Sequence, residues 1–121
     1  MTKTIMVVDD SASLRQVVKM ALNGAGYTVI EAGDGKAALS LLDGRQINMV
    51  ICDVNMPVMN GIEFVRAAKQ LPSYKFMPIL MLTTESQEEK KEQGKAAGAK
   101  AWMVKPFSPT QLLSAVSKLC V

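Results

Sequence analysis

The sequence predicts one doubly wound α/β domain, a (βα)5 arrangement around a parallel sheet. Short apolar runs of strand length alternate along the 121 residues with amphipathic stretches of helical length. Three of the runs are almost continuously hydrophobic, which is typical of strands buried on both faces of a parallel sheet. Strict alternation of this kind favours right-handed crossovers and helices on both faces of the sheet.

Five strands are expected, over residues 5–9, 28–32, 49–53, 79–83 and 101–105. The first, third and fourth of them are the nearly continuous apolar runs. The fifth is a shorter apolar run that ends at Lys105. Their lengths agree with those of strands and not with those of buried helices.

Five helices are expected after the strands, over residues 13–25, 35–43, 60–71, 87–97 and 109–119. Glycine marks the end of three of them, at Gly26, Gly44 and Gly98. The last helix has the clearest start, because Ser108 is a favourable N-cap and Pro109 suits the first helical position. The helix over 87–97 has the lowest propensity, since it contains Gly94 and many charges.

The composition excludes several classes of protein. No apolar stretch approaches the ~20 residues needed to span a bilayer, and the N-terminus lacks the hydrophobic region of a signal peptide. We therefore expect a soluble, cytoplasmic protein without a membrane partner, with Cys52 and Cys120 reduced. A net charge of +3 is too small and too scattered for a nucleic-acid partner. The absence of histidine excludes histidine catalysis, histidine metal ligands and a phosphohistidine formed on this chain.

Polar side chains stand at the carboxyl ends of four expected strands. They are Asp9 and Asp10, Asp53, Thr83, and Lys105. In doubly wound sheets, ligands bind outside these ends where the strand order reverses, and with the order 2-1-3-4-5 this point lies between the first and third strands. We therefore expect an anionic pocket with one ammonium beside it at this edge of the sheet.

Clustered carboxylates repel one another, so the pocket favours the binding of a cation. Mg²⁺ takes oxygen ligands, keeps several waters, and binds through one or two carboxylates together with phosphate oxygens. We expect Asp10 and Asp53 to bind it directly and Asp9 to bind it through water. The backbone carbonyl of Asn55 is within chain reach of the same ion.

The same pocket suits phosphoryl transfer. One oxygen of Asp53 remains free to act as a nucleophile, and carboxylates do form aspartyl-phosphate intermediates. Lys105 and the hydroxyl of Thr83 would neutralise and orient the phosphoryl oxygens. Each residue alone also has an ordinary explanation, as a helix cap, a strand end or a loop. Their coincidence at four strand ends favours the functional interpretation.

The motifs resemble the receiver domain of bacterial two-component response regulators. They are Val7-Val8-Asp9-Asp10-Ser11, Asp53-Val54-Asn55-Met56-Pro57 with Asn60-Gly61, Thr83-Thr84-Glu85, and Lys105-Pro106-Phe107. The resemblance covers residues 1–121, which we expect to form one receiver domain similar to the single-domain chemotaxis regulators of the CheY type. Those regulators have the flavodoxin-like strand order 2-1-3-4-5, so the order used above belongs to the resemblance.

The resemblance implies a phosphorylation switch. A histidine kinase of the chemotaxis CheA type would transfer a phosphoryl group to Asp53, and the acid pair Asp9 and Asp10 would hold Mg²⁺. Thr83 and Lys105 would contact the phosphoryl oxygens. The missing histidine fits this scheme, because the family's histidine lies on the kinase. A monomer is implied, whose further candidate partners are a flagellar motor switch protein and a phosphatase.

Two further pairs of positions set the response of such a switch. Asn55 and Glu85 correspond to positions that tune dephosphorylation, here with the pairing of fast-turnover chemotaxis members. Trp102, the switch partner of Thr83, stands where chemotaxis regulators usually carry a tyrosine that swings inward. Indole is larger than phenol and offers only an N–H donor, so its inward burial needs more room. We therefore expect Trp102 to move only partly and motor binding to be weak or absent.

Three alternatives remain. Within the family, the chain could be a phosphate sink or a phosphorelay intermediate that does not bind the flagellar motor. A phosphatase with an aspartate nucleophile would use the same groups, but Asn55 stands where that class carries its general acid. We therefore expect no enzyme beyond self-phosphorylation and dephosphorylation. A phosphorylation-independent scaffold would have no physical need for clustered like charges.

Overall fold

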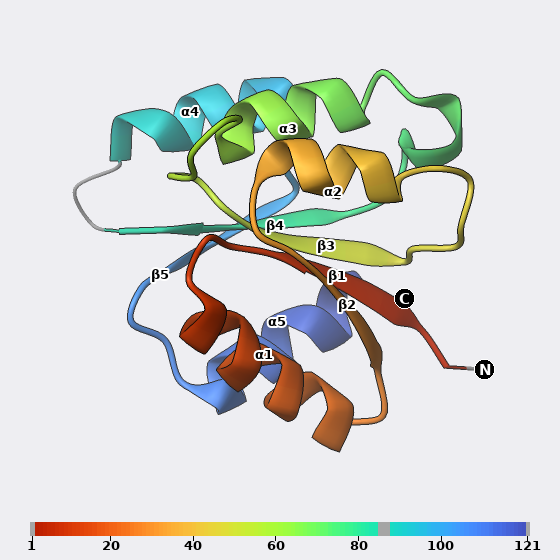
Figure 1. The fold of residues 1–121 in the computed structure, drawn as a ribbon. Coiled ribbons are helices and arrows are strands. Elements are labelled where there is room, and N and C mark those ends of the chain that lie inside the picture. Colours follow the sequence, from red (N-terminus) through yellow and green to blue (C-terminus); the bar gives the residue numbers. More distant parts are fainter. Residues whose placement is uncertain (1, 85–87, 121) are drawn as a thin grey trace.

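The computed structural model describes residues 2–84 and 88–120. Over these residues the chain forms a parallel sheet with the order β2-β1-β3-β4-β5, which confirms the expected fold class. The strands are β1 (Thr4–Val8), β2 (Thr28–Ala32), β3 (Met49–Asp53), β4 (Ile79–Thr83) and β5 (Ala101–Val104). The helices are α1 (Ala12–Gly24), α2 (Gly35–Leu41), α3 (Gly61–Ala68), the 3-10 turn η1 (Pro72–Tyr74), α4 (Glu88–Ala97) and α5 (Pro109–Leu119). Helices α2, α3 and α4 cover one face of the sheet, and α1 and α5 cover the other (Figure 1).

Most element bounds lie within one or two residues of the expected ones, and β2, β3, β4 and α5 have the expected bounds. The largest difference is at the end of α3, which was expected at residue 71 but lies at Ala68. The chain then enters η1, where Pro72 starts a new turn. Asn60 was expected as the first helical residue, but it is the N-cap and forms a capping box with Glu63. Within the described ranges, no helix has the length and apolar character needed to cross a membrane.

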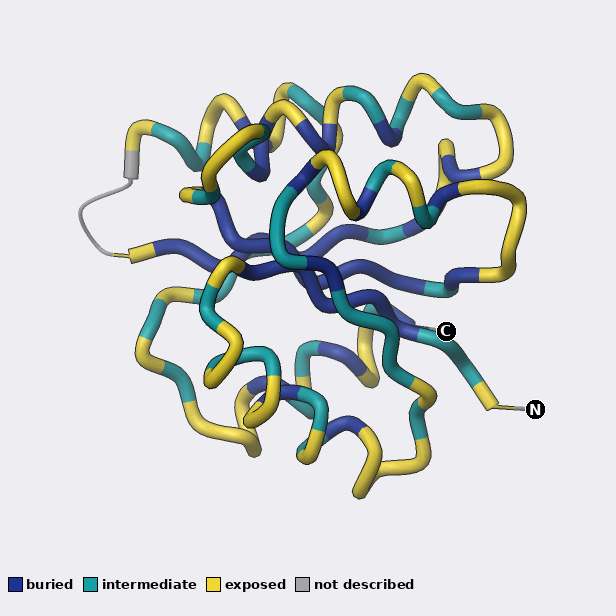
Figure 2. Tube along the Cα trace, viewed as in Figure 1, coloured by how far each residue is buried: buried dark blue, intermediate teal, exposed yellow. Residues whose placement is uncertain are grey.

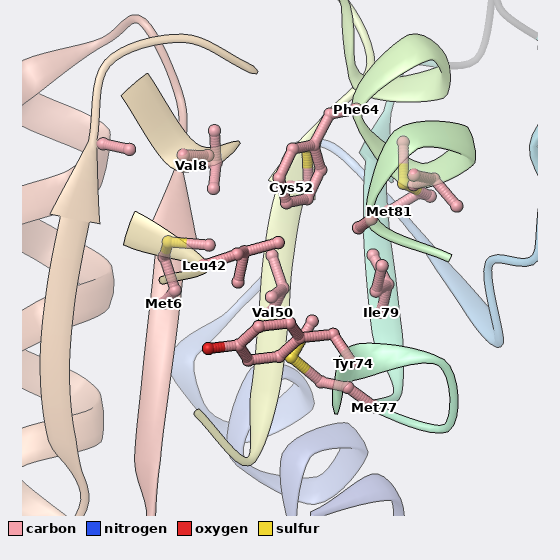
Figure 3. Close-up of a cluster of buried hydrophobic side chains, with 14 of the residues drawn as sticks. Met6, Val8, Leu42, Val50, Cys52, Phe64, Tyr74, Met77, Ile79 and Met81 are labelled. Atoms are coloured by element: carbon pink, nitrogen blue, oxygen red, sulfur yellow. The ribbon is translucent and has the colours of Figure 1, made fainter. Parts of the chain in front are cut away.

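Two apolar clusters fill the spaces between the sheet and its helices. Strands β1, β3 and β4 contribute side chains to both clusters and are buried over almost their whole length, as their apolar runs predicted (Figure 2). One cluster includes Phe64 of α3 and Cys52 of β3 (Figure 3). Burying each large apolar side chain contributes roughly 1.5–3 kcal/mol. The central strands are therefore firmly placed, and so are the residues at their carboxyl ends.

Candidate functional site

The sheet brings the polar strand ends to one edge. Strand β3 pairs with β1 and with β4, and β4 pairs with β5. Asp9 follows β1, and Asp53 ends β3. Thr83 ends β4, and Lys105 follows β5. Because parallel strands carry their carboxyl ends at the same edge, four segments that are far apart in the sequence meet there.

One ammonium lies among three carboxylates. Lys105 Nζ is 3.1 Å from Asp53 Oδ1 and 3.3 Å from Asp9 Oδ2. Carboxylate oxygens of Asp9, Asp10 and Asp53 all lie within 4.8 Å of one another. Asp9 and Asp53 are buried, whereas Asp10 is exposed. The cluster therefore has a surplus of two negative charges, which one divalent cation would balance.

Burial and mutual repulsion shift the ionisation of this acid cluster. Burial raises the pKa of Asp53 above its ordinary value and the charge of Asp9 raises it further, while Lys105 opposes both. Burial by itself would lower the pKa of Lys105, but the carboxylates of Asp53 and Asp9 raise it above its ordinary value. Lys105 therefore stays charged, yet it does not fully relieve the cost of ionising Asp53.

The donor set of the acid cluster fits Mg²⁺. All three candidate ligands offer carboxylate oxygens, which a small hard cation prefers. Both oxygens of Asp9 are already engaged, Oδ1 with the N–H of Ser11 at 2.9 Å and Oδ2 with Lys105. The direct binding of the ion by Asp10 and Asp53, with Asp9 acting through water, stays a prediction from the sequence.

Thr83 and Asn55 border the acid cluster from β4 and from the loop after β3. Thr83 is buried, and its carbonyl oxygen accepts a hydrogen bond from the backbone N–H of Lys105 at 2.7 Å. Asn55 is exposed, and its side-chain oxygen accepts a hydrogen bond from Lys90 of α4 at 3.4 Å. The loop that follows the proposed nucleophile is thus connected to α4, a contact that the sequence did not indicate.

Two other expected features lie elsewhere. Trp102 has no polar contact with the acid cluster and is half-buried on β5, where its ring contacts Gly94 of α4. The room that the indole needs is provided by Gly94, which the sequence indicated only as a weak point of the helix. Glu85 lies outside the described residues, as does Gln87, where the fourth helix was expected to begin.

Arg15 is a further part of the site that the sequence did not reveal. Its guanidinium donates a hydrogen bond to the carbonyl oxygen of Asp9 and forms an ion pair with Glu31 of β2 at 3.2 Å. Lys19 approaches the other carboxylate oxygen of Glu31 at 3.5 Å. Arg15 thus connects α1 with β2 and with the backbone that carries Asp9. In the sequence, Arg15 and Lys19 are only two cations four residues apart on one helix face. This pattern is equally typical of a solvated surface, so it does not reveal the contact with Asp9.

Replacing Arg15 with glutamine is expected to lower the free energy of unfolding by about 1.5–3 kcal/mol, the usual contribution of hydrogen bonds from a charged group. Lys19→Gln is the matched control, because Lys19 faces the same Glu31 but is 40% exposed where Arg15 is 20% exposed. Its loss should stay below about 1 kcal/mol. Urea unfolding followed by circular dichroism measures both variants, and equal losses would show that the contact with Asp9 adds nothing.

Comparison with known proteins places the chain among signalling proteins. The family model described as response regulator receiver domain matches residues 5–117. The solved structure of the chemotaxis response regulator CheY4 of Vibrio cholerae is 49% identical, has a TM-score of 0.93, and covers 98% of this chain and 99% of that one. The chemotaxis protein CheY of Pseudomonas aeruginosa is 34% identical over 116 residues, which are 95% of this chain and 94% of that protein.

Some relatives are longer than this chain. The phosphate regulon transcriptional regulatory protein PhoB of Pseudomonas aeruginosa is 37% identical over 112 residues, or 93% of this chain. This chain spans about half of PhoB, 49% of its length. The family match, the relatives and the acid cluster at the strand ends agree with one another. The chain belongs to the response regulator receiver domain family.

Proposed function

We propose that this chain is a phosphorylation-operated signalling module in which Asp53 accepts a phosphoryl group from a histidine kinase. The observation that carries the proposal is the placement of the Asp53 carboxylate, 3.1 Å from the Lys105 ammonium and within 4.8 Å of two further carboxylates. Asp53 therefore lies close both to a cation and to candidate metal ligands, which together supply the charge neutralisation that phosphoryl transfer requires. Membership of the receiver family implies the kinase partner.

Transfer to Asp53 would proceed by displacement at phosphorus. One carboxylate oxygen attacks the phosphorus of a phosphohistidine, the P–N bond breaks, and its electron pair stays on the imidazole nitrogen. The product on Asp53 is a mixed carboxylic–phosphoric anhydride. Lys105 attracts the phosphoryl oxygens, and Thr83, on the strand next to β3, donates its hydroxyl to them. Asp10 and Asp53 would hold Mg²⁺, which would supply further neutralisation of these oxygens.

The partner must supply the donor histidine, because this chain contains none. Water ends the signal when it attacks the phosphorus of phosphorylated Asp53. The bond between phosphorus and the carboxylate oxygen breaks, which regenerates the Asp53 carboxylate and releases inorganic phosphate. Asn55 is exposed and lies two residues after Asp53, a position that tunes dephosphorylation in the receiver family. We propose that Asn55 tunes the hydrolysis together with Glu85, which lies outside the described residues.

We further propose that the module works in chemotaxis, with a CheA-type kinase as donor. CheY4 of Vibrio cholerae and CheY of Pseudomonas aeruginosa support this, because each is matched over nearly its whole length. In this setting residues 1–121 act as one receiver domain. PhoB, by contrast, is a transcriptional regulator about twice as long, so the chemotaxis assignment depends on the CheY relatives.

Transfer of labelled phosphate from a phosphorylated chemotaxis kinase tests the proposal. We expect the label to move to the parent chain in the presence of Mg²⁺ and to remain on the kinase when Asp53→Asn is used. Asp43→Asn is the matched control, because Asp43 is an exposed aspartate that pairs with Arg45 and not with the acid cluster. Labelling of the Asp53→Asn variant would contradict the assignment.

Replacing Lys105 with alanine is expected to leave phosphorylation of Asp53 detectable but to abolish the conformational response. The metal ligands are retained in this variant, so transfer continues more slowly, whereas the contact that would pull β5 toward the phosphoryl group is lost. Phosphoprotein gels measure the level of phosphorylation, and amide chemical shifts of β4 and β5 measure the response. Lys118→Ala, at an exposed position on α5, is the control. A full response in Lys105→Ala would show that the ammonium is dispensable.

A phosphate sink or phosphorelay intermediate is the alternative, and one observation favours it. Trp102 packs against Gly94 of α4, and it stands where chemotaxis regulators usually carry a tyrosine. Titration of a flagellar motor switch peptide into the beryllofluoride-treated chain separates the two functions. Tight binding would support a motor-directed regulator, and no binding would support the sink.

A further inference from the structure

Trp102, the single tryptophan of the chain, packs against a glycine in the interior of α4. A Cβ built on Gly94 would lie 2.1 Å from Trp102 Cη2 and 2.6 Å from Trp102 Cζ2. Carbon atoms in contact stay about 3.5–4.0 Å apart, so any larger residue at position 94 would exclude the ring from its place. Gly94 is buried, and the six-membered ring of the indole lies against its backbone.

The indole points into the apolar layer beneath α4. Trp102 packs against the same cluster as Ala97 and Ala99, on the side of the sheet that α2, α3 and α4 cover. Its Nε1–H is buried and has no hydrogen-bond partner in the described part of the chain. An indole free to turn outward would bring this N–H to water. Packing therefore holds the ring inward at the cost of an unsatisfied donor.

Glycine at position 94 is unfavourable for the helix itself. Alanine is the better helix former at an interior position, and the sequence of α4 is already rich in charged residues. The presence of glycine at position 94 has a physical reason if a neighbouring side chain needs the space that a Cβ would occupy. The contact with Trp102 identifies that neighbour.

We propose that Gly94 and Trp102 form a matched pair that keeps the indole inward whether or not Asp53 is phosphorylated. This rests on the proposed function, since it concerns how the phosphorylation signal reaches the surface. It differs from the partial movement expected from the sequence, because the room is already present in the unphosphorylated chain. A partner that reads the face of α4 and β5 then meets the same aromatic surface in both states.

A double-mutant cycle tests the matched pair without phosphorylation. Gly94→Ala is expected to lower the melting temperature of the parent and to shift Trp102 emission to longer wavelength, because the new Cβ displaces the ring toward water. In the Trp102→Phe background, which lacks the second ring, Gly94→Ala should raise the melting temperature, since only the gain in helix propensity remains. Gly24→Ala in α1, with nothing within 4 Å of the new Cβ, is the control and should leave the emission unchanged.

The sign of the Gly94→Ala effect decides the outcome of the cycle. The same sign in both backgrounds would overturn the matched pair. If Gly94→Ala fails to fold in the parent, folding of the double variant with Trp102→Phe supports the pair, and failure of the double variant as well overturns it.

Acrylamide quenching of Trp102 fluorescence tests whether the ring moves on activation. With Mg²⁺ and beryllofluoride, which mimics a phosphoryl group, we expect the amide resonance of Asp53 to shift while the quenching constant of Trp102 stays unchanged. A changed quenching constant would overturn the fixed position of the ring. If the resonance of Asp53 did not shift, the proposed function would fail, and the double-mutant cycle would still decide whether the pair is matched.

Discussion

Replacing Asp53 with asparagine is expected to raise the stability of the metal-free chain, although it removes the proposed phosphoacceptor. Asp53 is only 6% exposed and lies within 4.8 Å of two other carboxylates. Its removal relieves a repulsion that Lys105 only partly balances. Two unit charges a few ångströms apart interact by up to about 4 kcal/mol near a protein surface, and the lost attraction to Lys105 offsets most of this, so a net gain of about 1 kcal/mol is expected.

The gain should depend on pH in a defined direction. In the folded chain the pKa of Asp53 lies above its ordinary value of 3.8. At a pH between 3.8 and this raised pKa, the folded chain holds a proton that the unfolded chain has released. The stability of the parent therefore falls as pH rises through this window, and the cost of the ionised carboxylate is fully present above it. The advantage of Asp53→Asn should be near zero below pH 3.8 and largest at neutral pH.

Urea unfolding in EDTA at several pH values measures this difference in stability. Asp43→Asn is the control, because the pKa of Asp43 is shifted in the opposite direction from that of Asp53. Hydrogen bonds from Arg45 lower the pKa of Asp43 to about 2, so removing this carboxylate should bring no gain in stability at neutral pH. Added Mg²⁺ should stabilise the parent more than Asp53→Asn, which lacks one ligand carboxylate. An Asp53→Asn variant less stable than the parent at neutral pH without metal would refute the charge-cluster interpretation.

Replacing Gly61 with alanine is expected to cost about 3 kcal/mol of folding free energy, because overpacking at a fixed contact forces the backbone to shift. The N–H of Gly61 donates a hydrogen bond to the carbonyl oxygen of Val54 at 2.8 Å, which holds the first turn of α3 against the end of β3. A Cβ on Gly61 would lie 2.1 Å from the carbonyl oxygen of Asp53 and 2.8 Å from Met81 Cε. The carbonyl belongs to a buried strand, so the segment that carries Asp53 must move.

Gly24→Ala is the matched control for this change as well. A Cβ on Gly24 would meet nothing within 4 Å, and Gly24 is the last residue of α1. Alanine there should be neutral or slightly stabilising. Urea unfolding measures the loss in Gly61→Ala, and the amide resonance of Asp53 reports the shift of the strand end. A Gly61→Ala variant as stable as the parent would show that α3 and the end of β3 can accommodate a Cβ without strain.

The strands and the last helix were the most predictable parts of the fold. A run such as that of β3 is apolar on both faces, which is the composition of a buried parallel strand. The start of α5 was equally clear, because Ser108 is a favourable N-cap and Pro109 suits the first helical position. The structure adds a capping box between Ser108 and Gln111. The end of α3 was not predicted, since Leu71 continues the apolar pattern and packs against the core from the turn before η1.

The site could be predicted as far as the backbone determines it. The acid cluster and Lys105 come together because parallel strands end at one edge, and the sequence marks those ends. The contact of Arg15 with the Asp9 carbonyl and that of Gly94 with Trp102 depend on how each helix lies on the sheet. Those positions result from packing between distant residues, which periodicity and spacing do not record.

The most direct test of the proposed phosphoacceptor locates the phosphoryl group itself. The chain is treated with phosphoramidate and Mg²⁺, and borohydride then reduces any acyl phosphate, which converts a phosphorylated aspartate into homoserine before proteolysis and mass spectrometry. We expect homoserine at Asp53 alone, in an amount that falls when EDTA removes the Mg²⁺. Homoserine at Asp9 or Asp10, or a phosphoryl group on a serine or threonine with Asp53 unchanged, would contradict the proposed site.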